Sequence, residues 1–192
     1  MKKALLLIPA VALLSGCISF GPKAPKSLLT LTTTSAVQAG AVRTATPTNT
    51  ILILSPTSTA AITTTRIPVY DGASDLSYVA DAAWNEAPAR GLQRLLSETV
   101  TARTNKIVLD PRQFSTGANM KLSGQLQRFG VDPSAMQVVV VFDAQLSRSA
   151  DTVETRRFEA RAPLSAIDGR SAGAALNAAA NDLATQIAAW IG

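Results

Sequence analysis

The stretch AAWNEAPARGLQRLLSETV, Ala82–Val100, decides the fold, because its apolar residues recur with the period of an α-helix. One face follows the helical spacing through Leu92, Leu95, Leu96, Thr99 and Arg103. The mostly opposite face carries polar side chains: Arg90, Gln93, Arg94, Glu98 and Thr101. Asn85 is the predicted N-cap, and Pro88 suits the first turn. The pattern predicts an amphipathic helix that ends at about Thr104.

A second helix is predicted at the end of the chain, over Ser171–Ile191. Its apolar stripe is Leu176, Ala180, Leu183, Ile187, Trp190 and Ile191. The many alanines of this segment suit close packing on a sheet. A helix lying on a membrane surface is the alternative, but no Lys or Arg follows Arg170 on its polar positions.

The remaining segments rich in β-branched residues predict strands. They are Ser27–Thr34, Thr50–Pro56, a short strand within Ile67–Trp84, Lys106–Leu109, Met120–Gln127, Met136–Leu146 and Thr152–Arg161. Gly130, Asp132 and Pro133 predict a turn, and the mixed charges of the last strand predict a solvated face. The element order β-β-(β)-α-β-β-β-β-α predicts an α+β fold, a mainly antiparallel sheet with two long helices packed on one face.

Composition excludes several classes of chemistry. The chain has no histidine and one cysteine, which removes Ser-His and Cys-His nucleophiles, the usual zinc sites and an internal disulfide. Two pairs suitable for other enzyme mechanisms, Ser115 with Lys121 and Asp71 with Asp75, lie in stretches without a motif. We therefore expect no enzyme activity and no catalytic, cofactor-binding or metal-binding residues.

The amino terminus predicts export. Lys2 and Lys3 precede an apolar run, Ala4–Leu14, that is too short to span a bilayer and typical of a secretory signal. The following Leu14-Ser15-Gly16-Cys17 resembles the lipobox of bacterial lipoproteins. That resemblance implies cleavage before Cys17, a diacylglycerol on its thiol and a third acyl chain, such as palmitate, on the new amino terminus. Residues 1–16 are then a signal peptide, 17–26 a lipidated tether and 27–192 a single α+β domain.

Two consequences follow for location and charge. Removal of the first sixteen residues takes away Lys2 and Lys3 and lowers the formal net charge from +5 to +3, too mild to indicate nucleic acid. Residue 18 is Ile rather than the aspartate that retains some lipoproteins at the inner membrane. We expect the periplasmic face of the outer membrane, with the inner membrane as the alternative.

The chain as a whole resembles the ABC-type transport auxiliary lipoproteins, which accompany transport systems built on mammalian-cell-entry (MCE) domains. The resemblance rests on the lipobox, on the strand Thr50–Pro56, on Trp84 and Pro88 before a long helix, on the strand Lys121–Asp132 and on the Ala-rich final helix. It departs where the family often has proline, tyrosine, leucine, aspartate and arginine in that order. Here Arg66, Pro68, Tyr70 and Asp71 occur in a different order.

The resemblance implies a lipid-anchored, non-enzymatic periplasmic accessory subunit that helps an ABC/MCE-type system move lipids between the inner and outer membranes. Its partners would be an MCE-domain protein, ABC transporter subunits and, through acylated Cys17, the membrane. An outer-membrane assembly lipoprotein supporting lipopolysaccharide export or cell-wall synthesis shares the same features and is the alternative. The sequence leaves open association into a homo-oligomer and direct binding of lipid by this subunit.

Overall fold

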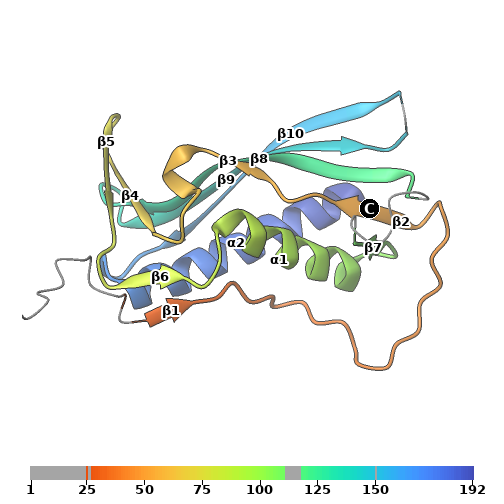
Figure 1. Cartoon of the computed structure of the whole chain (residues 1–192), viewed down its shortest axis with the longest axis horizontal. Coiled ribbons are helices and arrows are strands. Elements are labelled where there is room, and N and C mark those ends of the chain that lie inside the picture. Colours follow the sequence, from red (N-terminus) through yellow and green to blue (C-terminus); the bar gives the residue numbers. More distant parts are fainter. Residues whose placement is uncertain (1–24, 26, 111–117, 150) are drawn as a thin grey trace, which may run out of the picture.

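The computed structural model of the chain describes residue 25 and residues 27–110, 118–149 and 151–192. Two helices, α1 (Pro88–Arg103) and α2 (Gly169–Ile191), lie side by side on one face of the main sheet (Figure 1). The strands are β1 Ser27–Leu29, β2 Thr50–Ile53, β3 Thr57–Ser58, β4 Pro68–Asp71, β5 Asp75–Tyr78, β6 Ala82–Trp84, β7 Ile107–Leu109, β8 Met120–Asp132, β9 Gln137–Ser147 and β10 Val153–Pro163. The predicted α+β class, with both helices on one face, is confirmed.

The main sheet is mixed rather than purely antiparallel. Its order is β10-β9-β8-β2-β7, and β8, β9 and β10 form the predicted antiparallel meander. On its other edge β8 pairs in parallel with β2, then β3, then β4, while β2 also pairs in parallel with β7. Parallel neighbours need a crossover between them, and α1 provides it between β2 and β7. β1 and β6 form a separate two-stranded parallel sheet.

Several predicted boundaries were wrong for local reasons. β8 continues through the predicted turn, because Gly130 and Asp132 pair with β9, and the chain turns only after Asp132. The first strand is only three residues long. α1 has Ala87 rather than Asn85 as its N-cap, since the Asn85 N–H donates to the Leu29 carbonyl instead.

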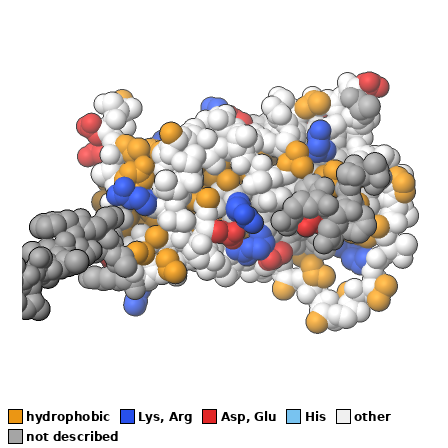
Figure 2. Space-filling model, in the orientation of Figure 1, with side chains coloured by type: hydrophobic (Ala, Val, Ile, Leu, Met, Phe, Trp, Pro, Cys, Tyr) orange, Lys and Arg blue, Asp and Glu red, His pale blue; other side chains and the backbone are white. Residues whose placement is uncertain are grey.

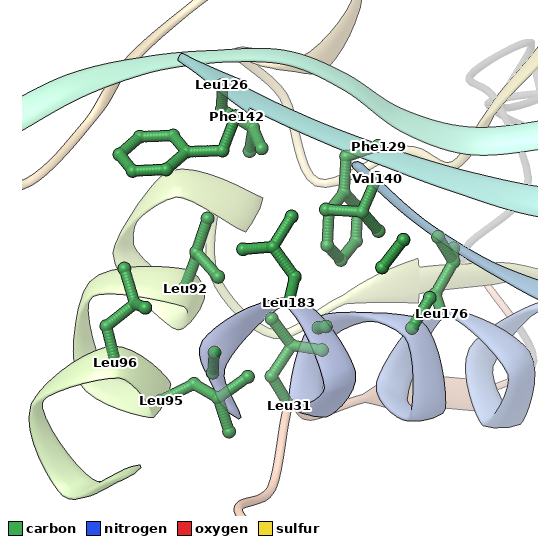
Figure 3. Close-up of a cluster of buried hydrophobic side chains, with 14 of the residues drawn as sticks. Leu31, Leu92, Leu95, Leu96, Leu126, Phe129, Val140, Phe142, Leu176 and Leu183 are labelled. Atoms are coloured by element: carbon green, nitrogen blue, oxygen red, sulfur yellow. The ribbon is translucent and has the colours of Figure 1, made fainter. Parts of the chain in front are cut away.

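The core lies between the helices and the inner face of β8 and β9. Leucines of α1 and α2 point at apolar side chains of these strands (Figure 3). The core residues labelled there are Leu31, Leu92, Leu95, Leu96, Leu126, Phe129, Val140, Phe142, Leu176 and Leu183. Trp84 closes this core edge-on against Phe129, with ring centroids 5.5 Å apart. Its indole N–H is buried and has no hydrogen-bond partner among the described residues. Within that part of the chain, no helix is long and apolar enough to cross a membrane.

The segment 30–35, here called the strap, crosses the helices without forming a strand and is fastened by a buried side chain of α2. Asn181 accepts from the Thr34 N–H at 2.8 Å and donates to the Thr32 carbonyl at 2.9 Å. Asn177, one turn earlier, accepts from the Thr32 N–H at 2.8 Å. The two asparagines thus supply the backbone partners that a neighbouring strand would otherwise provide.

Asn181→Ala should therefore destabilise the protein by about 1–3 kcal/mol, because it removes a buried side chain whose part-buried hydrogen bonds hold the strap on α2. Asn177→Ala is the matched control, since its contact with the strap is exposed and single. The measurement is urea unfolding followed by circular dichroism. Equal midpoints for wild type and Asn181→Ala would contradict this role for the side chain.

Asp168 caps the N-terminus of α2. Its carboxylate accepts from the Ser171 N–H at 2.8 Å and from the Ser171 hydroxyl at 3.0 Å. These hydrogen bonds, the backbone one first, hold the pKa of Asp168 below its usual range. Negative charge at this position is also favoured by the helix dipole.

Because the pKa of Asp168 is lower in the folded than in the unfolded chain, its stabilising effect should be complete above the unfolded value of about 3.9 and disappear as the pH falls through the folded value. Asp168→Ala should thus lower the unfolding temperature at neutral pH, with the difference from wild type shrinking in acid. Asp168→Asn keeps an oxygen acceptor and is the control for charge alone. A difference that stays constant from neutral to acid pH would argue against the carboxylate cap.

Candidate functional site

A groove of about 860 Å³ runs along α1, between this helix and the edge of the sheet at β2 and β7. Figure 2 shows the charged side chains that gather over α1 in the middle of this face. The lining residues are Val37, Ile53, Ser55, Glu86, Arg90, Gln93, Arg94, Ser97, Glu98, Thr101, Val108, Leu109 and Asp110. Six of the thirteen come from the face of α1 opposite its buried leucines.

The floor of the groove exists because β2 extends beyond its last pair with β7. The last β2–β7 pair is Leu52 with Leu109, and Ile53, the last residue of β2, has no strand partner on that side among the described residues. The Ile53 carbonyl, which a longer β7 would have paired, accepts from Gln93 Nε2 at 2.8 Å instead. Ser55 beyond it is exposed. Within the described part of the chain, the groove therefore combines an apolar floor with a strand end that a side chain, Gln93, pairs in place of a strand.

The wall on α1 is a chain of ion pairs centred on Arg94. Arg94 contacts Glu86 at 3.0 Å and Glu98 at 4.0 Å, and it also donates to the Leu31 carbonyl of the strap at 3.1 Å. Arg90 lies 4.0 Å from Glu86, with 70% of its side chain exposed. Half-exposed pairs of this kind contribute only about 0–1 kcal/mol each. A partner could therefore exchange its own charges for them at small cost.

Of the two residue pairs considered for catalysis, the structure brings together Asp71 and Asp75. Asp71 and Asp75 are register partners at the end of the β4–β5 hairpin, where both are exposed. Lys121 is exposed on β8. Ser115 and the predicted lipid-attachment residue Cys17 lie outside the described residues. Among the residues that are described, no group of three or more His, Cys, Asp or Glu side chains could hold a metal ion.

The outer face of the sheet is a second polar surface. Arg157 of β10 forms a two-point ion pair with Asp143 of β9, at 2.6 and 2.8 Å. Hydrogen bonding from Arg157 lowers the pKa of Asp143. The exposed charges of β10 agree with the solvated strand face predicted for it. This surface pairs its own charges, and β10 is an edge strand that pairs only with β9 among the described residues.

A model of the family described as "ABC-type transport auxiliary lipoprotein component" matches residues 30–188, from the strap to the end of α2. The chain belongs to this family. The matched range contains α1, the groove and almost the whole core, so the predicted resemblance is confirmed. As a family of lipoproteins, the auxiliary components are attached to a membrane with the folded part on the periplasmic side, and they serve ABC-type transport.

Solved structures show the same fold at low sequence identity. Protein XCC0632 from Xanthomonas campestris, of family DUF330, is 21% identical, with 86% of this chain and 94% of that one covered and a TM-score of 0.68. An uncharacterized protein is 12% identical over 79% and 97% of the two chains, with a TM-score of 0.66. No curated protein matches the sequence significantly.

A more distant similarity is to PelC from Paraburkholderia phytofirmans, whose structure is a dodecamer. It is 12% identical over 75% of this chain and 91% of that one, with a TM-score of 0.37. A similarity this distant says nothing about how the auxiliary lipoprotein assembles. Homo-oligomerisation of this chain stays a prediction.

Proposed function

We propose that this auxiliary lipoprotein is a non-enzymatic periplasmic subunit of an ABC/MCE-type system, and that it assists lipid transport between the inner and outer membranes through protein contacts. Triacylated Cys17 holds it on the periplasmic face of the outer membrane. Its partners are the MCE-domain protein and ABC transporter subunits. The family membership supports the class of system, and the groove along α1 carries the proposed mode of action.

The groove suits an extended segment of a partner protein. Such a segment can lie beside the end of β2 and continue past Ser55, pairing through its own backbone groups by displacing Gln93 from the Ile53 carbonyl. Its alternate side chains would lie on the apolar floor at Ile53 and Val108. Charged side chains of the partner would meet Arg90 and Glu98, which are exposed and weakly paired. Backbone pairing supplies affinity, and the charged wall supplies selection.

The same geometry supports binding rather than chemistry. The acidic and basic side chains along α1 face one another in partly exposed ion pairs, which are weak and can exchange partners. Ser97 and Thr101 have hydroxyl groups in the groove, but both donate to backbone carbonyls of their own helix, at 2.8 and 2.7 Å. Neither hydroxyl therefore has a general base to activate it.

A photo-crosslinking amino acid placed at Ser97 or Thr101 should capture the MCE-domain partner in cells, because both positions line the groove. Gln145 and Thr155, on the outer face of the sheet, are the matched control positions. The measurement is mass spectrometry of the crosslinked products. Equal capture from both surfaces would contradict the groove. Recovery of lipopolysaccharide-export or cell-wall proteins instead would favour the alternative function.

The charge of the wall can be tested in the same assay. Arg90→Glu should reduce crosslinking from Thr101, whereas Arg156→Glu on exposed β10 should leave it unchanged. Both residues are exposed, so neither variant should change the unfolding midpoint. Loss of crosslinking in both variants would mean that net charge rather than the groove matters.

Cys17→Ser should abolish acylation and leave the precursor unprocessed or misplaced, because the thiol that would carry the lipid is gone. Ile18→Asp should shift the lipidated protein toward the inner membrane where aspartate sorting operates. Both are measured by membrane fractionation and by the mass of the mature amino terminus. Normal membrane retention of Cys17→Ser would refute lipid anchoring at this residue.

A further inference from the structure

The end of the molecule at which the domain begins carries four exposed apolar side chains that the core does not use. Their exposed fractions are 67% for Leu28, 46% for Ile167, 44% for Leu76 and 41% for Met136. Leu28 is the second residue of β1, and the predicted tether immediately precedes this strand. We call this group the apolar rim.

Contacts between distant segments bring the rim together. β1 pairs with β6, with Leu28 opposite Ala83, and the Gly169 N–H at the start of α2 donates to Asp81 just before β6. Ile167, two residues before Gly169, therefore lies near β1. The turn that holds Met136 is joined to the same loop, since the Leu164 N–H donates to the Met136 carbonyl at 2.8 Å. The β4–β5 hairpin, with Leu76, lies at this end as well (Figure 1).

Charges at this end are close to balanced. The segments that carry the rim hold Asp71, Asp75 and Asp168 on one side of the balance and Arg66 and Arg170 on the other, and the sequence of the tether adds Lys23 and Lys26. The Arg66 guanidinium lies 3.8 Å from the centre of the Tyr78 ring, on the β4–β5 hairpin. A Tyr with a charged neighbour suits the boundary between headgroups and acyl chains, where one part of the side chain is apolar and the other hydrated. The balance favours a zwitterionic lipid surface over a strongly anionic one.

We propose that the apolar rim rests on the bilayer that holds the anchor, inserting into the headgroup–acyl boundary of zwitterionic phospholipid. The inference rests on the proposed acylation of Cys17. Nine residues lie between Cys17 and Ser27, so the ten steps of the chain keep the rim within about 33 Å of the surface at about 3.3 Å per residue. A short tether raises the effective concentration of the rim at the bilayer, and weak apolar contacts then suffice.

Val153 and Val42 are exposed apolar residues that lie away from the rim. Val153 is also exposed, but it begins β10 and pairs with Ser147, at the opposite end of the meander from Met136. Val42 lies on the segment that Arg43 fastens to the C-terminal end of α1, at the Thr101 and Thr104 carbonyls. Neither residue can reach the bilayer while the rim is seated on it.

The test uses the full lipidated chain in phosphatidylcholine–phosphatidylethanolamine vesicles, with nitroxide labels on Leu28→Cys, Met136→Cys, Ile167→Cys and the control Val153→Cys. The thioether consumes Cys17, so each added thiol is the only one that reacts. Collisions with oxygen should rise and collisions with a water-soluble nickel chelate should fall at the three rim positions and not at 153. Phosphatidylglycerol should leave this pattern unchanged. Water-like accessibility at all four labels would overturn the proposal, as would contact that needs the anionic lipid.

A paired variant separates the rim from the anchor. In the Ile167→Cys protein, Leu28→Ser with Met136→Ser should return the label to water, whereas Val42→Ser should not. Flotation of the vesicles reports the anchor independently. Protein that floats with water-exposed labels contradicts the rim alone, and protein that does not float contradicts both the rim and the anchor. Groove crosslinking reports the proposed partner contact separately.

Discussion

The fold depends on one strand, β8, that supplies hydrogen bonds along both of its edges. β9 occupies one edge for almost the whole length of β8, and three short segments, β2, β3 and β4, occupy the other in succession. None of those short strands could be stable alone, because two to four residues make too few backbone bonds and too little buried surface. β8 also turns apolar side chains toward the helices, including Leu126 and Phe129. A shift of one residue in its register would exchange this face for the polar one. Gly124 shows how close the pairing is, since a Cβ there would lie 2.2 Å from the Asp143 carbonyl oxygen.

The sequence predicted the helices and strands better than it predicted which of them lie side by side. Both helices were found to within about three residues, because large apolar residues at helical spacing have one simple explanation. The meander of β8, β9 and β10 followed from alternation and short turns. The short apolar run of β2 was identified as a strand, but nothing in such a run states which strand lies beside it, so its parallel pairs with β7 and β8 were not predicted. The turn placed at Gly130 failed for a related reason: the residues that favour turns are also tolerated in a strand whose partner fixes them.

For the candidate site too, the sequence predicted the local element but not its neighbours. The polar face of α1, with Gln93 and Arg94, was correctly placed opposite the leucines, yet the groove beside it depends on where β7 stops relative to β2. That is a difference of one or two residues between strands more than fifty positions apart. Asn181 is not part of the predicted apolar stripe of α2, yet it is buried under the strap, where its amide replaces a strand. Polar residues that satisfy distant backbone groups have no periodic signature. They become visible only once the chain that covers them is placed.

The positions of the groove and the apolar rim relative to each other bear on how the protein could work. α1 begins next to β6 and runs away from the end that carries β1, and α2 with its 23 residues is about 34 Å long at about 1.5 Å per residue. With the proposed rim on the membrane, the helices extend away from the bilayer and the groove opens to the side, above the headgroups. A partner strand could then reach the edge of β2 from the periplasm without displacing lipid. The weak ion pairs of the groove wall would stay hydrated until the partner arrives, which favours a contact that is selective but exchangeable. An auxiliary subunit with this arrangement would contribute a fixed position at the membrane and a recognisable edge, and would leave the movement of lipid to the proteins that it holds.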